Sequence, residues 1–419
     1  MPHTCAAGYA HHHGVRRMRT VDVVVIGAGP AGLSAASRIA EAGPTQVLVV
    51  DEGPTPGGRL RSQLYRRGSD WHIGAERAAS LTQRALRAGV IIESGRQVWS
   101  LDPGFVLGLS GGESISADYI VIATGAAEKT FGLPGWTIPG VLAVGAVQTM
   151  LNVNRVLPGA RLAVIGIDPL SLSIVDELAA ADIGVAGVYL PPPAKFSAPE
   201  QPSAVFTRLG SLHRLAPNRL LGLAMKALTI SGIAEVVARI WPTTGVRMAG
   251  MPLHLRECVV GIDGDDDVRS IRTRRVNTNG EPVGRERVIP VDAVCLSGGL
   301  YPLQDLTRDC LLVDVPELGG RVPLHGPNLE TGTAGMFVAG NITGIESAEV
   351  ARAQGELVGT VIAEKIAGHE DQSEAVITAR ADVEEARAAA PLTFMPEIHA
   401  GRRRMHELWC DHLGQDVRA

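Results

Sequence analysis

The feature that most constrains the fold is the segment VDVVVIGAGPAGLSAASRIAEAG, which begins at Val21. Its first residues, Val21 to Ile26, are mostly β-branched and predict a buried parallel strand. Three glycines follow with the spacing GxGxxG, namely Gly27, Gly29 and Gly32. In such a turn the first glycine allows the tight bend, the second lets the backbone approach a pyrophosphate, and the third lets the next helix pack on the strand. The segment therefore predicts a Rossmann-type nucleotide site.

The residues around this turn support a bound dinucleotide. A helix expected at about 31–42 would direct its N-terminal N–H groups and its dipole at the phosphates, with Pro30 and Ala31 at its start. A second apolar strand ends at Asp51, 24 residues after Gly27. A carboxylate at this place accepts hydrogen bonds from a ribose diol, and Glu52 follows it. This context favours a nucleotide site over a glycine-rich turn without a ligand.

Three later segments resemble the two-dinucleotide-binding flavoproteins. They are DEGPTPGGRL (51–60), DYIVIATGA (118–126) and GMFVAGNITGIESAEVARAQGELVG (335–359). The resemblance implies FAD as the cofactor, with contacts from Gly58, Arg59, Ala123, Thr124, Gly125, Gly340 and Asn341, and with Val98 near the adenine. The superfamily has an aspartate where this chain has Asn341, but an amide still forms hydrogen bonds with a ribityl hydroxyl.

A second nucleotide turn is degenerate. The strand Arg161–Ile165 runs into Gly166, but the next two glycine positions hold Asp168 and Ser171. At about 4 Å and an effective dielectric of about 20, each contact of this acid with a phosphate charge costs about 4 kcal/mol. Asp168 instead fits a helix N-cap followed by proline. NAD(P) binding at this turn is therefore disfavoured, whereas another adenylate bound in a different way stays open.

The stretch LPGWTIPGVLAVGAVQTMLNVNRVLPGARLAVIG (133–166) resembles a narrower family. This is the family of flavin-binding α-type subunits of hetero-oligomeric amine and imino-acid dehydrogenases, which includes subunits of proline and hydroxyproline dehydrogenase, opine oxidase, hydrogen cyanide synthase and sarcosine oxidase. The similarity covers about residues 20–368. It implies a FAD-dependent oxidoreductase subunit that works with a second, catalytic FAD subunit on a small amine or imino acid.

The family layout predicts an α/β fold in which a discontinuous FAD-binding Rossmann domain (18–150 and 288–368) encloses a Rossmann-like insert (151–287). A disordered leader (1–17) would precede it, with Met18 as an alternative start, and a helical tail (369–419) would follow it. Many relatives carry a cysteine-rich iron–sulfur module near the C-terminus, but residues 369–419 contain only Cys410. No catalytic residue is predicted.

Composition excludes several other classes. The net charge of −5 gives no reason to expect a nucleic-acid partner. None of the five cysteines forms a CxxC pair, so no metal site or redox dithiol is expected and a cytoplasmic location is favoured. No apolar run reaches the length of about 18 residues that indicates a membrane span.

Three segments and two other functions stay open. The apolar stretch 219–241 fits a core helix better than a docking face, 263–270 fits an acidic hairpin turn better than a calcium loop, and the basic stretch 401–409 fits a partner contact or a solvated tail. The alternative functions are a stand-alone NAD(P)H-dependent flavin reductase and a non-catalytic, flavin-loaded scaffold.

Overall fold

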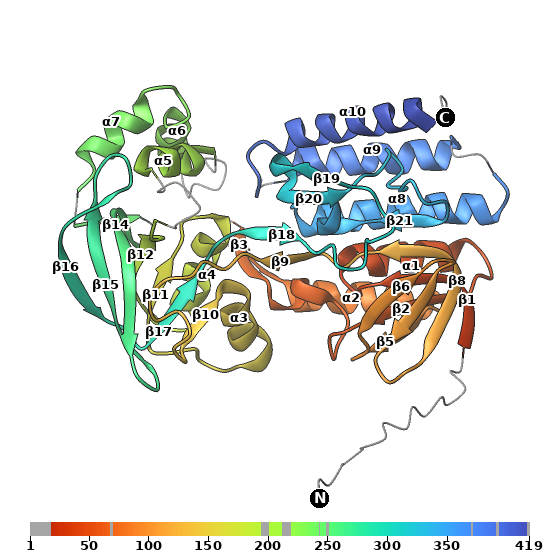
Figure 1. Cartoon of the computed structure of the whole chain (residues 1–419), viewed down its shortest axis with the longest axis horizontal. Coiled ribbons are helices and arrows are strands. Elements are labelled where there is room, and N and C mark those ends of the chain that lie inside the picture. Colours follow the sequence, from red (N-terminus) through yellow and green to blue (C-terminus); the bar gives the residue numbers. More distant parts are fainter. Residues whose placement is uncertain are drawn as a thin grey trace, which may run out of the picture.

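The computed structural model describes residues 18–67, 70–193, 201–211, 219–242, 244–248, 251–369, 372–390 and 394–416. The expected leader, residues 1–17, lies outside the described residues. The chain forms two lobes, each built on its own sheet, and crosses between them through the antiparallel strands β9 (Ala126–Glu128) and β18 (Leu300–Pro302) (Figure 1). Within the described ranges, no helix is both long and apolar enough to span a membrane.

The first lobe contains a seven-stranded sheet with the order β5-β2-β1-β8-β7-β6, in which β21 also pairs with β8. The central strand β1 pairs in parallel with both β2 and β8, and its residues Val23, Val24 and Val25 have no exposed surface. The bounds are β1 Met18–Ile26, β2 Val47–Asp51, β5 Ile91–Ser94, β6 Val98–Asp102, β7 Val106–Leu109, β8 Ser114–Ile122 and β21 Met336–Val338. The predicted buried parallel strand is confirmed.

The helices of this lobe pack closely against one another. Helix α1 (Pro30–Ala42) lies against α8 (Ala348–Ile366), and α2 (Gly74–Arg87) contacts α1. A Cβ at Gly355 would lie 2.1 Å from the carbonyl oxygen of Ala31, so only glycine permits this approach. The segment 335–359 is thereby held against the start of α1.

The second lobe contains an eight-stranded sheet with the order β10-β17-β11-β12-β14-β15-β16, in which β13 pairs with β14. Its bounds are β10 Val141–Ala143, β11 Arg161–Ile165, β12 Gly184–Leu190, β13 Val246–Met248, β14 Met251–Gly264, β15 Val268–Val276, β16 Pro282–Pro290 and β17 Ala293–Leu296. The sheet therefore extends on both sides of the predicted insert 151–287. The reason is that β17 pairs in parallel with β10 and β11, which draws both flanking segments into this lobe.

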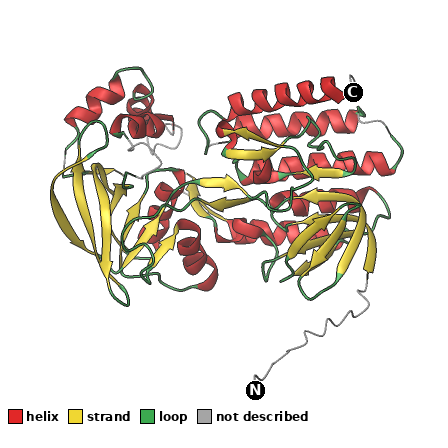
Figure 2. Ribbon diagram, viewed as in Figure 1, coloured by secondary structure: helices red, strands yellow, loops and turns green. Residues whose placement is uncertain are grey.

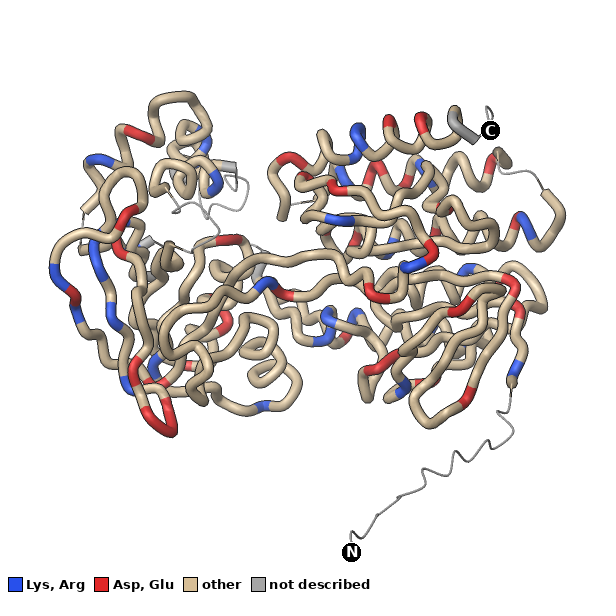
Figure 3. Tube along the Cα trace, viewed as in Figure 1, with Lys and Arg blue, Asp and Glu red and all other residues tan. Residues whose placement is uncertain are grey.

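The helices of the second lobe are α3 Val144–Gln148, which continues as a π-helical segment Thr149–Asn154, α4 Pro169–Ala180, α5 Pro202–Ser211, α6 Arg219–Ala227 and α7 Ile233–Ile240. The stretch 219–241, predicted as one core helix, is two helices separated at Gly232, whose φ is +86°. Ala234 and Ala238 are buried, but Leu220 and Ile240 are exposed, so only one side of each helix packs. The acidic turn is confirmed as the tip of the β14–β15 hairpin (Figure 3).

The predicted tail is part of the first lobe. Helices α9 (Glu374–Ala389) and α10 (Ile398–Asp416) stack beyond α8, as the layered red helices of Figure 2 show. In α10, Met405 and Trp409 are buried against Leu318 and its apolar neighbours. The expectation that 401–409 is a solvated tail is wrong for these two side chains, because they form an apolar face at helical spacing, and the alternative of a partner contact stays a prediction.

Short elements complete the described chain. They are the 3₁₀ turns Gly58–Ser62, Pro316–Leu318 and Gly340–Thr343, the hairpin of β3 (Leu64–Arg67) and β4 (Asp70–Ile73), and the hairpin of β19 (Leu312–Val315) and β20 (Gly320–Pro323).

Candidate functional site

The first glycine turn has the geometry that its sequence predicts. Gly27 has a φ of +107°, and a Cβ there would lie 2.4 Å from the carbonyl oxygen of Ala123. A Cβ at Gly32 would lie 1.9 Å from the carbonyl oxygen of Gly27, so these two glycines are required by packing. A Cβ at Gly29 would meet nothing within 4 Å. Gly29 therefore leaves open space at the N-terminus of α1, where N–H groups and the helix dipole favour an anion.

Asp51 fastens the end of β2 to this turn. Its Oδ2 accepts a hydrogen bond of 2.6 Å from the backbone N–H of Ala28, and its Oδ1 accepts one of 2.7 Å from Gly53. Each carboxylate oxygen has a second lone pair that can still accept a hydroxyl. The acid thus holds the turn and keeps the capacity to bind a ribose.

One large cavity of about 2350 Å³ begins at this turn and extends into the second lobe. Thirteen of the predicted site residues line it, namely Gly27, Gly29, Pro30, Ala31, Asp51, Glu52, Gly58, Arg59, Ala123, Thr124, Gly125, Gly340 and Asn341. Gly32 does not line it and acts through packing. Val98 does not line it either; the residue is 9% exposed and its side chain packs in the core of the first sheet, so the predicted contact of this strand's backbone with the adenine stays a prediction.

The predicted second loop lies directly against the first. The backbone N–H of Gly57 donates to the carbonyl oxygen of Ala28 at 2.8 Å, and a Cβ at Gly58 would lie 3.2 Å from the Cα of Gly29. Arg59 lines the cavity, but its Nη1 donates to Oε1 of Glu128 at 2.6 Å. The guanidinium is therefore held by an acid of the strand that crosses to the second lobe.

The C-terminal motif closes the cavity from the side of α8. Gly340 has a φ of +80°, and its backbone N–H donates to Oε1 of Gln354 at 2.7 Å. Oδ1 of Asn341 accepts a hydrogen bond of 3.1 Å from the backbone N–H of Glu346. Nδ2 and the second lone pair of Oδ1 are therefore still able to meet a ligand hydroxyl.

The second turn is occupied by its own acid. Oδ1 of Asp168 accepts hydrogen bonds from the backbone N–H groups of Leu170 and Ser171 at 2.8 and 2.9 Å. Oδ2 accepts one from Oγ of Ser297 at 2.6 Å, and Oγ of Ser171 receives the backbone N–H of Asp168 at 2.9 Å. The prediction that Asp168 is an N-cap is confirmed. The carboxylate stands where a phosphate would meet the helix N-terminus.

A buried charge cluster behind Asn341 was not predicted from the sequence. Glu346 lies between Arg387 of α9 and Arg402 of α10, with 2.9 Å between its Oε1 and Nε of Arg387. Burial alone would raise the pKa of Glu346, but the two guanidinium groups hold it below its usual value. Burial and, after it, the positive charge of Arg402 lower the pKa of His325 to about 3. The only sequence signal was the arginine run at 402–404, which reads equally well as a solvated surface.

A buried acid on the second lobe was also missed. Glu177 is 2% exposed, and burial raises the pKa of its carboxyl to about 7 even though Gln148, Asn152 and Ser173 donate hydrogen bonds to it. Its position in the apolar helix sequence PLSLSIVDELAA carries no signal that distinguishes it from an exposed glutamate. Among the described residues, no group of three or more His, Cys, Asp or Glu side chains is placed to hold a metal ion.

Comparison with known proteins agrees with this geometry. The family model for pyridine nucleotide-disulphide oxidoreductases matches residues 21–173, which span both glycine turns. The chain is 30% identical over 354 residues to the opine oxidase A subunit of Agrobacterium tumefaciens (strain Ach5), covering 80% of this chain and 64% of that protein. It is 24% identical over 300 residues to the HcnB subunit of hydrogen cyanide synthase from Pseudomonas aeruginosa, covering 68% and 58%.

Solved structures show the same fold. L-proline dehydrogenase from P. horikoshii superposes with a TM-score of 0.62 at 19% identity, covering 90% of this chain and 61% of that one. Thioredoxin reductase from T. acidophilum superposes with a TM-score of 0.57 at 19% identity, covering 84% and 99%. Against the opine oxidase A subunits, the chain spans 64%, 69% and 61% of their lengths. The predicted α/β, two-dinucleotide-domain fold class is confirmed.

Proposed function

We propose that this chain is the FAD-binding subunit of a hetero-oligomeric amine or imino-acid oxidoreductase, because residues 21–173 match the pyridine nucleotide-disulphide oxidoreductase model and the chain is similar to the A subunits of opine oxidases. Relatives named as subunits, of opine oxidase, hydrogen cyanide synthase and sarcosine oxidase, support membership of a multi-subunit enzyme. The partner we propose is a second FAD-containing subunit that oxidises the C–N bond of a small amine or imino acid.

The residues of the cavity fit FAD. The open space at Gly29 accommodates a pyrophosphate, which the N-terminus of α1 stabilises, and the close approach of Gly58 narrows the channel beside it. Asp51 and Glu52 would bind the adenosine ribose, and Asn341 would bind the ribityl chain. When bound, FAD supplies the reversible acceptance of two electrons. The ring end would lie beyond Asn341, between the two lobes.

The observation that carries this proposal is the contrast between the two turns. The first turn is open at Gly29, whereas the second is filled by Asp168 and Ser297. A nicotinamide dinucleotide would have to displace a capped carboxylate and accept its repulsion. The electrons are therefore proposed to come from amine oxidation in the partner subunit.

Anaerobic stopped-flow absorbance of the FAD-loaded chain tests this function. The flavin band is followed with NADH, with NADPH, and with proline, hydroxyproline, sarcosine and glycine, first for the chain alone and then for the chain co-expressed with its catalytic partner. We expect slow reduction by either nicotinamide and fast reduction by one amine only in the complex. Fast reduction by NADH would make the chain a reductase, and no reduction in the complex would make it a scaffold; either result overturns the proposal.

The closed second turn gives a separate prediction. Asp168→Ala removes the N-cap of α4, so we expect the free energy of unfolding to fall by about 1–2 kcal/mol, without any gain in the rate of NADH oxidation. Urea unfolding and a steady-state NADH assay measure the two effects. Asp265→Ala, at a side chain that is 78% exposed in the hairpin tip, is the control and should unfold as the wild type does. Rapid NADH oxidation by the Asp168 variant would show that this acid alone excludes the nucleotide.

A further inference from the structure

A buried carboxyl lies directly behind the wall of the cavity between the lobes. Glu177 of α4 is 2% exposed. One of its oxygens accepts a hydrogen bond from Nε2 of Gln148 at 2.7 Å, and the other accepts one from Nδ2 of Asn152 at 2.6 Å. Oγ of Ser173 lies 3.4 Å from Oε1. The hydrogen-bond partners that the described residues give to Glu177 are thus uncharged.

The two amide donors are positioned by an unusual backbone. Gln148 ends α3, and Asn152 lies in the π-helical segment that follows. Such segments are rare in proteins, but those that occur are often found at functional sites. Nδ2 of Asn152 also donates to the carbonyl oxygen of Ser62 at 2.7 Å, which belongs to the 3₁₀ turn of the first lobe. Glu177 is therefore the centre of a polar network that joins both lobes.

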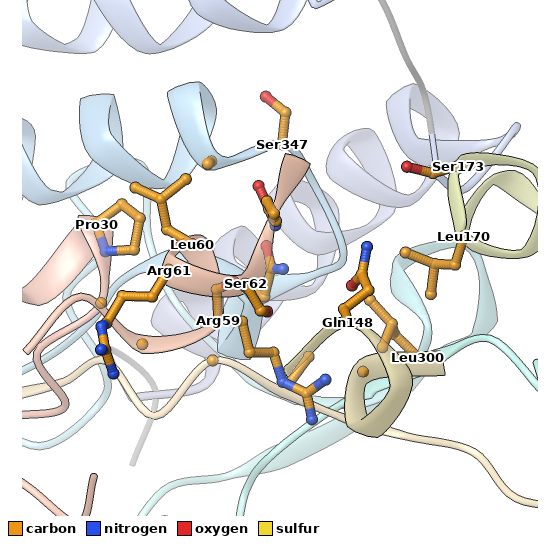
Figure 4. A pocket seen from close by; sticks show the side chains of 18 of the residues that line it. Pro30, Arg59, Leu60, Arg61, Ser62, Gln148, Leu170, Ser173, Leu300 and Ser347 are labelled. Atoms are coloured by element: carbon orange, nitrogen blue, oxygen red, sulfur yellow. Dashed lines mark hydrogen bonds between the residues drawn. The ribbon is translucent and has the colours of Figure 1, made fainter. Parts of the chain in front are cut away.

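This network reaches the wall of the cavity between the two lobes, where the proposed function would place the flavin ring. Gln148 and Ser62 both line the cavity, and Figure 4 shows the side chain of Gln148 lying between Ser62 and Leu170. Because the Nε2 of Gln148 is held by Glu177, the carboxamide of Gln148 has a fixed orientation at the cavity wall. The acid itself has no direct access to a ligand and acts through this amide.

Among the described residues, the charged groups that act on Glu177 include no cation. Asp176, beside it on α4, adds like charge, and Cys295 of β17 is close enough to feel the charge of Glu177. Burial is the main reason that the pKa rises to about 7. A carboxyl whose pKa lies near neutral pH changes its protonation state readily when the charge in the cavity changes.

We propose that Glu177 is a positioning residue of the flavin site, which orients Gln148 at the ring end of the cavity and takes up a proton when that end becomes more negative. This inference rests on the proposed function, because it requires FAD in the cavity. Extra negative charge at the ring end disfavours the ionised form of Glu177, since like charges repel strongly away from water. The proton moves from solvent to the carboxylate, and no covalent bond forms or breaks apart from that O–H bond.

The test is the midpoint potential of the bound flavin as a function of pH. The full chain loaded with FAD is titrated with dithionite and mediators between pH 5.5 and 8.5, which needs neither partner nor amine. We expect the wild type to bind additional protons, up to one per two electrons, in a window that begins near pH 7, and Glu177→Gln to lack this added dependence. Glu235→Gln, an exposed acid on α7, should behave as the wild type. Identical curves for wild type and Glu177→Gln would overturn the proposal.

A second measurement needs no variant. Infrared difference spectra of the wild type, reduced minus oxidised, should show the carbonyl stretch of a newly protonated carboxylic acid at pH 8 and should lose it at pH 5. Absence of that band at pH 8 would also overturn the proposal.

The failures are distinguishable: absence of amine-dependent reduction in the complex contradicts the proposed function alone, whereas a flat response at Glu177 contradicts this inference alone. A chain that binds no FAD contradicts both.

The same carboxyl predicts a pH dependence of stability that needs no cofactor. Its folded pKa of about 7 lies above the unfolded value of about 4.3, so between these values the folded state binds more protons than the unfolded state. The contribution of Glu177 to stability is therefore full below about pH 4.3 and is lost as the pH rises to about 7. Urea unfolding of the apo chain should show this slope, and Glu177→Gln should show less of it.

Discussion

A chain carrying Gly29→Ala is expected to fold as the wild type does and to lose its FAD. The added Cβ meets no protein atom within 4 Å, so the apo variant should have an unchanged melting temperature. The methyl group would project into the space that a pyrophosphate must enter at the N-terminus of α1. We expect FAD to bind at least about 100-fold more weakly, which corresponds to about 2.8 kcal/mol. Fluorescence titration of the apo chain with FAD measures the affinity, and circular dichroism measures the melting.

Two other glycines sharpen this test. Gly43→Ala, at the opposite end of the same helix, also adds a Cβ with nothing within 4 Å and should change neither property. Gly32→Ala would place its Cβ 1.9 Å from the carbonyl oxygen of Gly27 and is expected to destabilise the fold itself. Undiminished FAD affinity in the Gly29 variant would mean that the pyrophosphate does not cross this turn.

Glu346→Gln is expected to destabilise the first lobe by about 3–5 kcal/mol, because it leaves the guanidinium groups of Arg387 and Arg402 buried without their shared carboxylate. The pKa of Glu346 is lowered by these two charges, against the effect of burial. Its stabilisation is therefore present above the unfolded pKa of about 4.3 and is lost as the pH falls through the lower folded value. Urea unfolding at neutral and acidic pH measures both effects.

A control for this variant lies on the same arginine. Glu384 also pairs with Arg387, but its side chain is 66% exposed, so Glu384→Gln should change stability by no more than about 0.5 kcal/mol. If Glu346→Gln unfolds at the wild-type urea concentration, apolar contacts alone hold α9 and α10 in place. In that case the buried ion cluster adds orientation of the helices and little stability.

The features predicted best from the sequence lie where the backbone can adopt few conformations. The positions of Gly27 and Gly32 leave no room for a Cβ, so their spacing predicted the turn and the helix that follows. Asp168 followed by proline predicted a helix start because the acid and the ring each favour one position of the first turn. These features are local, and the structure reproduces them.

Features that depend on distant pairing were not predictable in the same way. The second sheet extends beyond the predicted insert because β10 is three residues long and acquires its place only by pairing with β17, more than a hundred residues later. Arg59 lines the cavity, but its ion pair with Glu128 of β9 was not predicted. Glu346 and Glu177 are separated in sequence from the residues that pair with them, so no short motif marks either acid.

The bond between Asp168 and Ser297 also has a consequence at the level of the cell. NADH is abundant in metabolism, and a flavoprotein that accepted electrons from it would stay reduced whether or not an amine was present. If the second turn, filled by Asp168 and Ser297, excludes NADH as proposed, the flavin is protected from reduction by it. With the proposed function, the redox state of this protein would then follow the supply of its amine substrate alone, because Asp168 and Ser297 keep NADH from acting as a second electron donor.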